Sequence, residues 1–239
     1  MNIAEKYKLF VIEDCAQSMG AEYLFSNGKK LKCGNIGHVS ATSFFPSKNL
    51  GCYGDGGAIF TNDDELAYKM RGIVNHGMYK RYHHDVVGVN SRLDSIQAAV
   101  LNAKLPHLDN YNRARQIAAN KYSERLKDIS LLILPDVRYH NSDNSESYNC
   151  HVFHQYTIRL VGGNRDNLVK YLNSKDIPCG VYYPIPLHKQ KAYSDERYDE
   201  SNFKITNQIS DEVFSLPMHT ELSDDQIDYI TDNIRNYFS

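Results

Sequence analysis

A lysine within a segment rich in hydroxyl groups and glycines is the first feature of this sequence that could do chemistry. Lys48 stands after an apolar stretch, residues 39–45, and after Pro46, which cannot continue a sheet ladder. Ser43 and Ser47 precede it, and four glycines follow within seven positions. A neutral amine attacks carbonyl groups, hydroxyls bind phosphate, and glycines let a backbone approach a ligand closely. The segment predicts a site that holds a phosphate and uses an amine; an ordinary solvated lysine is the alternative.

A carboxylate follows a second apolar stretch, close to the start of the chain. We expect residues 8–13 to form a β-strand and Asp14 to begin the loop 14–21, which also carries Gln17. Open α/β sheets present their sites at the carboxyl ends of strands. An aspartate in this place also commonly caps a turn, and that interpretation of Asp14 stays open. No Gly-x-Gly-x-x-Gly follows the strand, which disfavours a Rossmann dehydrogenase.

The surrounding pattern predicts the elements that must position these groups. Alternation about Asn27-Gly28 predicts a hairpin over residues 22–38, and residues 58–61 predict a strand that returns from the glycines. Asn62 is expected to cap a helix that ends near residue 75. A long helix is expected to begin at residues 91–94, to end or kink at Pro106, and to be followed by another helix over residues 109–127.

A polar loop at residues 138–150 predicts a boundary, after which a smaller α/β unit follows. Residues 152–161 and 179–183 are expected to be strands. Asn164 is expected to cap one helix, and Ser223 with Gln226 to form the capping box of the last helix. The buried face of that last helix is expected to carry three isoleucines: Ile227, Ile230 and Ile234.

Composition argues against several classes of protein. The net charge of −2 gives no electrostatic footprint for nucleic acid or for an anionic membrane, and no apolar run reaches the length of a membrane span. The N-terminus lacks a signal-peptide pattern, and the five scattered cysteines favour a reducing, cytoplasmic setting. His76, His83 and His84 have no metal-ligand spacing, so we expect no metal site.

Five segments taken together resemble one known family. They are VIEDCAQSMGA, SFFPSKNLGCYGDGGA, GVNSRLDSIQAA, YYPIPLH and SLPMH. Their order and spacing, over essentially the whole chain, resemble the nucleotide-sugar aminotransferases of the DegT/DnrJ/EryC/StrS type, which depend on pyridoxal 5′-phosphate (PLP). The resemblance implies the α/β architecture of fold-type I PLP-dependent aminotransferases. Residues 1–128 would be the C-terminal portion of the large, mixed-sheet PLP-binding domain, and residues 129–239 the small C-terminal α/β domain.

The resemblance also implies roles for the cofactor-binding residues. Lys48 would bond to the PLP aldehyde and later carry the proton as the catalytic base and acid. Asp14 would pair with the pyridine nitrogen and keep it protonated, and Gln17 would lie against the ring. Ser43 would bind the cofactor phosphate. Asn90 would reach the phosphate in a neighbouring subunit, so that a homodimer would share its active sites.

Arg92, Tyr182 and Tyr183 would hold the nucleotide sugar. The resemblance implies that an amino acid, glutamate, donates the amino group to a keto group of that sugar. The motifs are most similar to enzymes for UDP-linked 3-keto-N-acetylhexosamines or uronates, in particular UDP-2-acetamido-2-deoxy-3-oxo-D-glucuronate. Such enzymes serve surface polysaccharide synthesis, for example of lipopolysaccharide and O-antigen. Tyr182 stands where these relatives often have histidine, which leaves the identity of the sugar open.

Members of the family carry a substantial region before the strand that ends in Asp14. That region holds a Gly-Thr/Ser phosphate loop and a group over the ring, and neither is found here. We therefore expect a truncated product, a split-gene half or a fragment that binds PLP weakly by itself. Two alternatives stay open: a non-catalytic relative, such as a dehydratase or regulator, or a binding scaffold that uses the helix at residues 113–127 and tyrosine-rich surface.

Overall fold

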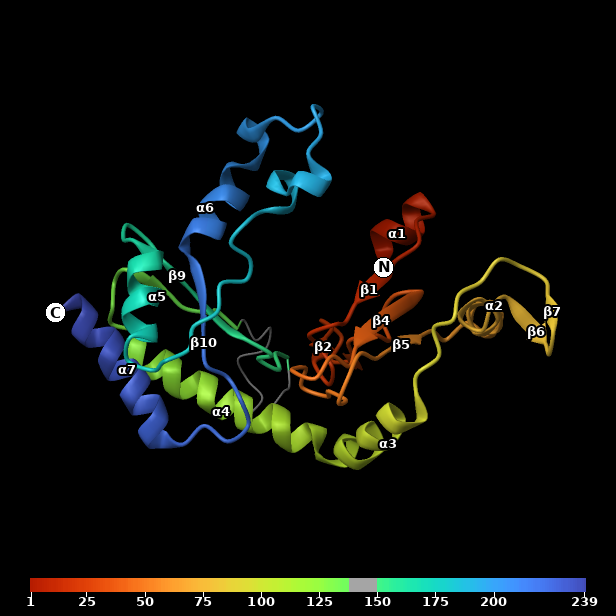
Figure 1. Cartoon of the computed structure of the whole chain (residues 1–239), viewed down its shortest axis with the longest axis horizontal. Helices are drawn as coiled ribbons and strands as arrows, with labels where there is room; N and C mark the ends of the chain where they lie inside the picture. Colours follow the sequence, from red (N-terminus) through yellow and green to blue (C-terminus); the bar gives the residue numbers. More distant parts are fainter. Residues whose placement is uncertain (138–149) are drawn as a thin grey trace. The chain divides into compact units, whose positions relative to one another are not determined.

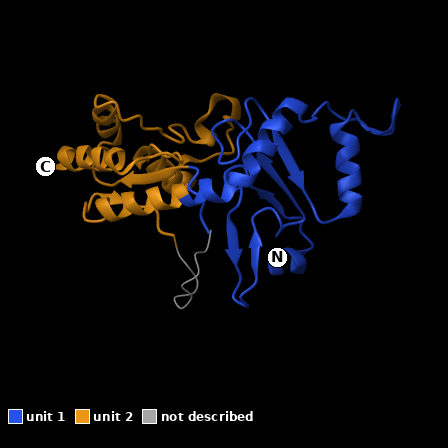
Figure 2. Cartoon of the chain, turned by 90° about the horizontal axis from the view of Figure 1, so that it is seen from below, with its two compact units in different colours: residues 1–113, 138–154 blue, residues 114–137, 155–239 orange. Residues whose placement is uncertain are grey.

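The structure is a computed structural model that describes residues 1–137 and 150–239 (Figure 1). The chain forms two compact units (Figure 2). Unit 1 contains residues 1–113 and 138–154, and unit 2 contains residues 114–137 and 155–239. The unit boundary falls within a long helix, whereas the predicted domain boundary after residue 128 stays a prediction. The expected boundary loop, residues 138–150, lies outside the described residues except for its last position.

A three-stranded sheet with the order β1-β4-β5 forms the centre of unit 1 (Figure 1). β1 (Ile12–Asp14) runs parallel to β4 (Val39–Ser43), and β5 (Gly57–Phe60) runs antiparallel to β4. Asp14 is in register with Ala41. Because parallel strands end at the same edge of a sheet, Asp14 and Ser43 both lie at the carboxyl edge of this pair.

The first strand is shorter than the sequence predicted. Residues 2–7 form helix α1 (Asn2–Tyr7), and Lys8 turns the chain with a φ of 53°. Strand pairing begins only at Ile12, because β4 begins at Val39, the partner of Ile12 in the register. The predicted strand at residues 8–13 is therefore wrong over its first part. The apolar residues Phe10 and Ile12 are exposed by 83% and 73%.

The other predicted elements of unit 1 form with shifted ends. β2 (Glu22–Leu24) and β3 (Lys30–Lys32) make the expected hairpin. Helix α2 (Asp64–Val74) is capped by Asp63 rather than by Asn62. The expected loop after α2 contains another hairpin, β6 (Met78–Lys80) and β7 (His83–His84).

A helical segment interrupted near Pro106 follows this hairpin, as the sequence predicted. Helix α3 (Ser95–Lys104), the short turn η1 (Leu105–His107) and helix α4 (Leu108–Leu126) follow one another directly. The buried apolar core of unit 1 packs the turn after β4 against these helices: Phe44, Leu50, Cys52, Leu101 and Leu108. Over the described residues, no helix combines the length and the apolar character needed to cross a membrane.

Unit 2 is built on an antiparallel sheet with the order β10-β9-β8. Its strands are β8 (Leu132–Ile133), β9 (Tyr156–Leu160) and β10 (Val213–Leu216). The helices after β9 are α5 (Arg165–Asn173), which Asn164 caps as predicted, then α6 (Lys204–Glu212) and α7 (Asp224–Phe238). The short turns η2 (Leu187–Lys189), η3 (Lys191–Tyr193) and η4 (Glu200–Phe203) precede α6.

Two strand predictions in unit 2 need correction. The predicted strand at residues 152–161 forms only over β9. The predicted strand at residues 179–183 is wrong, because only Gly180 pairs there, in an isolated bridge with Ser215 of β10. Two prolines follow closely at positions 184 and 186. Each restricts the residue before it and lacks an N–H donor, so the apolar stretch cannot extend its pairing.

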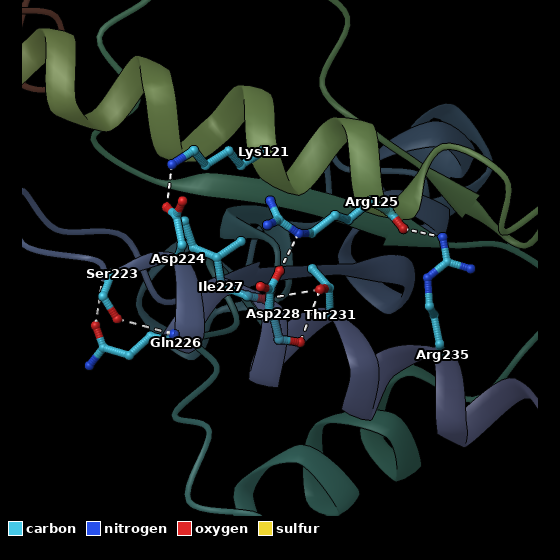
Figure 3. A network of polar contacts seen from close by, with 9 residues as sticks. All are labelled: Lys121, Arg125, Ser223, Asp224, Gln226, Ile227, Asp228, Thr231 and Arg235. Carbon is cyan, nitrogen blue, oxygen red and sulfur yellow. Dashed lines mark hydrogen bonds and ion pairs between the residues drawn. The ribbon is translucent and has the colours of Figure 1, made fainter.

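Polar contacts join α7 to α4 within unit 2 (Figure 3). Ser223 and Gln226 form the predicted capping box, and the three isoleucines of α7 are buried as expected. Lys121 pairs with Asp224, and the Arg125 Nε lies 2.5 Å from the Asp228 Oδ1. These ion pairs are solvent-accessible, so each contributes little, and the buried isoleucines supply most of the stabilisation.

Glu13 fastens the segment before β4 to β1. Its carboxylate accepts hydrogen bonds from the backbone N–H groups of Gly34, Ile36 and Gly37, at 2.9, 2.7 and 2.6 Å. Partial burial raises the pKa of Glu13, but the three hydrogen bonds lower it by more, so the pKa lies below its ordinary value. These hydrogen bonds thus fix Glu13, the residue directly before Asp14, against the segment that leads into β4.

We predict that Glu13→Gln destabilises the chain by roughly 1–3 kcal/mol at pH 7, because an amide cannot accept all three hydrogen bonds. The pKa of Glu13 is lower in the folded than in the unfolded state. Its contribution is therefore complete above about pH 4.3 and is lost as the pH falls through the folded pKa. Urea unfolding at several pH values measures both effects.

The exposed Glu196 provides the matched control, as Glu196→Gln removes the same charge without removing a described hydrogen bond. A Glu13→Gln variant as stable as Glu196→Gln at pH 7 would contradict the role given to Glu13.

Candidate functional site

Asp14 ends β1 with one carboxylate oxygen engaged by its own turn. Its Oδ1 accepts the Ala16 N–H at 3.0 Å, so the turn-capping interpretation is confirmed for this oxygen. Among the described residues, no hydrogen bond reaches Oδ2. The Cys15 N–H continues the strand pairing to the Ala41 carbonyl at 2.8 Å. Asp14 is therefore exposed, yet its backbone is fixed on both sides and one oxygen remains available to a ligand.

Lys48 lies in a tight turn directly after β4. The Lys48 N–H donates to the Phe45 carbonyl at 2.9 Å, and the Ser43 hydroxyl accepts the Phe45 N–H at 3.2 Å. The β4 pairing stops at Ser43, two residues earlier than the sequence predicted, because the chain turns toward Pro46. The Lys48 side chain is half-buried and has no hydrogen bond or ion pair among the described residues. Its amine is thus uncommitted.

The glycines after Lys48 allow the chain to return against its own turn. A Cβ on Gly51 would lie 2.4 Å from the Pro46 carbonyl oxygen and 2.8 Å from the Phe45 carbonyl oxygen. The Cys52 N–H and thiol both donate to the Phe44 carbonyl at 2.9 Å. Only a residue without a side chain fits at position 51, next to these carbonyl groups. The glycine-rich segment therefore packs against the turn that carries Lys48 and fixes its backbone.

The loop that carries Gln17 is also attached to β4. The Thr42 hydroxyl donates to the Cys15 carbonyl at 2.9 Å. The Gln17 side chain is exposed and makes no described hydrogen bond. Burial raises the pKa of the Cys15 and Cys33 thiols, so both are protonated at neutral pH and neither is an activated nucleophile. Neither thiol therefore competes with the Lys48 amine as a nucleophile at this edge.

Asn90 and Arg92 lie elsewhere in unit 1. Asn90 pairs with Asn75 in an isolated bridge, and Arg92 Nη1 donates to Asn75 Oδ1 at 3.0 Å. Both line a cavity of about 900 Å³ together with Thr42 of β4 and Gly57 of β5. Neither Asp14 nor Lys48 lines this cavity. The structure therefore places the predicted unit 1 residues in two groups, one at the carboxyl edge of β1 and β4 and the other along this cavity.

Tyr182 and Tyr183 belong to unit 2. Both side chains are exposed, by 46% and 68%. They line a mainly apolar cavity of about 510 Å³ with Leu187 and with residues of α6 such as Ile209. Two aromatic rings beside an apolar surface suit a flat, partly polar ligand.

Sequence reasoning missed a pair of hydrogen-bonded asparagines in unit 1. Asn49 directly follows Lys48, and Asn112 is fully buried on α4. Their side chains meet at 2.7 Å, between Asn49 Nδ2 and Asn112 Oδ1. The available signal was an asparagine on the apolar side of the helix predicted at residues 109–127.

The donor set at the carboxyl edge fits PLP. It offers a free carboxylate oxygen at Asp14, an uncommitted amine at Lys48 and the hydroxyl of Ser43. PLP needs an acid for its ring nitrogen, an amine for its aldehyde and donors for its phosphate. In the part of the chain that the structure describes, no group of three or more His, Cys, Asp or Glu side chains could hold a metal ion.

Comparison with known proteins gives one consistent family. The model of the DegT/DnrJ/EryC1/StrS aminotransferase family matches residues 1–235. The chain is 44% identical over 237 residues to UDP-N-acetyl-3-dehydro-alpha-D-glucosamine 3-aminotransferase of Acidithiobacillus ferrooxidans. It is 44% identical over 234 residues to UDP-2-acetamido-2-deoxy-3-oxo-D-glucuronate aminotransferase of Pseudomonas aeruginosa, and 43% identical over 241 residues to a pleiotropic regulatory protein of Geobacillus stearothermophilus.

These matches cover 98–99% of this chain but only 59–60% of each relative, so the chain spans about 60% of the length of the relatives it matches. A solved structure of DesV from S. venezuelae, in complex with a ketimine intermediate, has a TM-score of 0.87 and 35% identity. That match covers 99% of this chain and 60% of DesV. The α/β fold class and aminotransferase architecture expected from the sequence are confirmed.

We predict that Gly51→Ala lowers the free energy of unfolding by roughly 1–3 kcal/mol, because the added methyl group would overlap two carbonyl oxygens of the Lys48 turn. Gly54→Ala is the matched control, since its Cβ would meet only the end of the flexible Gln97 side chain at 3.1 Å. Thermal unfolding measures the difference. Equal stability of the two variants would show that the close return of the chain is not required.

Proposed function

The chain belongs to the DegT/DnrJ/EryC1/StrS aminotransferase family, and we propose that it takes part in PLP-dependent transfer of an amino group to a keto group of a nucleotide-linked sugar. The observation that carries the proposal is the carboxyl edge of β1 and β4. There the uncommitted amine of Lys48 follows one strand, and the free oxygen of Asp14 ends the other. The amino donor is an amino acid, for which we propose glutamate.

The proposed substrate is a UDP-linked 3-keto-N-acetylhexosamine or its uronate. Two relatives at 44% identity act, by name, on UDP-linked 3-oxo sugars, one of them a glucuronate. In this proposal Arg92 binds an anionic group of the substrate, and Tyr182 and Tyr183 bind its sugar or nucleotide part. A guanidinium makes charge-assisted hydrogen bonds to carboxylates and phosphates, which suits either anionic group. The amino sugar would serve surface polysaccharide synthesis, such as lipopolysaccharide and O-antigen.

Several residues of the chain would hold PLP. Lys48 Nζ would hold the aldehyde, Asp14 Oδ2 the ring nitrogen, and the Ser43 hydroxyl would donate to the phosphate. Gln17 would lie against the ring, and Asn90 would donate to the phosphate in a second copy of the chain. When bound, PLP supplies an electron sink for the electron pair left on the amino-bearing carbon.

The chain's own residues would then orient the reactants and move the proton. The Asp14 carboxylate would accept a hydrogen bond from the ring nitrogen and keep that nitrogen protonated, which favours electron withdrawal by the ring. Lys48 Nζ would take the proton from the amino-bearing carbon as the base and return a proton as the acid in the second step. The turn after β4 fixes the backbone from which the Lys48 side chain extends, through the hydrogen bond of the Lys48 N–H to the Phe45 carbonyl.

The proposal includes a homodimer with shared sites and a cytoplasmic location. In the homodimer, Asn90 would act in the site of the neighbouring copy, and the free cysteines support the cytoplasmic location. One relative is named as a regulatory protein. The presence of both Lys48 and Asp14 argues against a non-catalytic role, because a regulator or a scaffold needs neither an uncommitted amine nor a free carboxylate oxygen at this edge.

We predict that borohydride reduction of the chain with excess PLP leaves a pyridoxyl group on Lys48, because its amine is the uncommitted nucleophile of the site. Peptide mass mapping identifies the modified lysine. Lys48→Arg should remove the label from that peptide, and Lys32→Arg, at an exposed position of the hairpin, should not. Labelling spread over surface lysines, with none at Lys48, would overturn the proposal in favour of a scaffold.

We further predict that Asp14→Asn lowers the rate of amino transfer roughly 10²–10³-fold, because an amide cannot keep the ring nitrogen protonated. The rate should be measured as a single turnover between the PLP-loaded chain and glutamate. Asp63→Asn, at the cap of α2 and away from this edge, is the control. A rate for Asp14→Asn within a few-fold of that control would contradict the role of Asp14.

A further inference from the structure

We infer that Asn112 is a positioning residue that ties the turn carrying Lys48 to the loop carrying Asp14 and Gln17. The inference rests on the proposed function for its meaning, but the contacts that carry it belong to unit 1 alone. Asn112 lies near the start of α4 and is fully buried.

The amide of Asn112 is used at both ends. Its Oδ1 accepts a hydrogen bond from Asn49 Nδ2 at 2.7 Å, and its own Nδ2 donates to the Met19 carbonyl at 3.1 Å. Asn49 is the residue next to Lys48, and Met19 lies in the loop that begins after Asp14. One buried side chain therefore connects the two segments that carry the proposed cofactor residues.

Asn49 is held through its amino group. Its Nδ2 donates both to Asn112 and to the Val152 carbonyl, at 2.8 Å in the second case. Its Oδ1 is buried and has no hydrogen-bond partner among the described residues. An amino group with both hydrogens engaged cannot rotate without losing a bond, so Asn49 fixes the start of the chain that leaves Lys48.

Gly20 shows how closely Asn112 approaches the Asp14 loop. Gly20 has a φ of +87°, and a Cβ there would lie 2.5 Å from Asn112 Nδ2. No other residue fits this backbone without strain or without displacing the amide. The glycine at position 20 therefore lets the loop backbone lie directly against the Asn112 amide.

The two hydrogen bonds of Asn112 connect the chain beyond the last paired residues of β1 and β4. β1 and β4 are paired up to Asp14 and Ala41, and the Thr42 hydroxyl adds a bond to Cys15. Lys48 and Gln17 lie beyond these bonds, in segments without strand pairing. Asn112 supplies a link in this region. Loss of this link should let the Lys48 amine and the loop that carries Gln17 move independently. The rate of cofactor capture should then fall, whereas the chain should still fold.

The test compares Asn112→Ala with Asn110→Ala, which lies on the exposed side of the same helix. Amide hydrogen exchange of the full chain reports on peptides covering residues 14–21 and 46–54. We expect exchange at least fivefold faster in both peptides for Asn112→Ala and unchanged for Asn110→Ala. The second readout is the rate of pyridoxyl capture at Lys48 at saturating PLP, which should fall about tenfold.

Two further variants separate the two ends of the bridge. Asn112→Asp keeps the acceptor for Asn49 but loses the donor to Met19, so exchange should rise in residues 14–21 alone. Asn49→Ala should raise it in residues 46–54 alone. These milder variants also decide the matter if Asn112→Ala fails to fold.

Unchanged exchange in both segments for Asn112→Ala, or an equal rise over the whole chain in all three variants, would overturn the inference. Hydrogen exchange needs no cofactor. A wild-type chain that captures no PLP would overturn the proposed function, whereas the exchange data would still decide whether Asn112 links the two segments.

Discussion

The parallel pairing of β1 with β4 is the constraint on which the rest of this structure depends. Its register sets Asp14 opposite Ala41, so the acid and the lysine-bearing turn leave the sheet at the same edge. A shift by one residue would reverse the side of the sheet that each side chain faces. Glu13 stabilises this register from behind by accepting three backbone N–H groups of the segment before β4.

The turn after β4 adds an amine, that of Lys48, to the sheet edge at which Asp14 lies. Gly51 lets the chain pass close behind Lys48, and the apolar core beneath it is closed by Phe44, Leu50 and Cys52. The backbone at Lys48 is therefore fixed without an ion pair of the lysine itself. A lysine that is fixed by its backbone and free at its nitrogen differs from a solvated surface lysine in both respects.

Much of this could be predicted from the sequence, for reasons that differ between elements. The hairpin at Asn27-Gly28, the cap at Asn164 and the capping box at Ser223 depend on local interactions, which short patterns encode. The strand at residues 8–13 could not be bounded, because its extent depends on where β4 begins. The apolar stretch at residues 179–183 failed as a strand because partner geometry, rather than propensity, decides pairing. Asn112 was missed because its partners are 63 and 93 residues away.

The central claim is that Lys48 and Asp14 bind the same PLP molecule, Lys48 at its aldehyde and Asp14 at its ring nitrogen. A crystal structure of the chain after borohydride reduction with PLP tests it most directly. The account predicts electron density for a pyridoxyl group continuous with Lys48 Nζ, and a ring nitrogen roughly 2.7–2.9 Å from an Asp14 carboxylate oxygen. A pyridoxyl group on Lys48 whose ring nitrogen points to solvent, or to any other side chain, would contradict it.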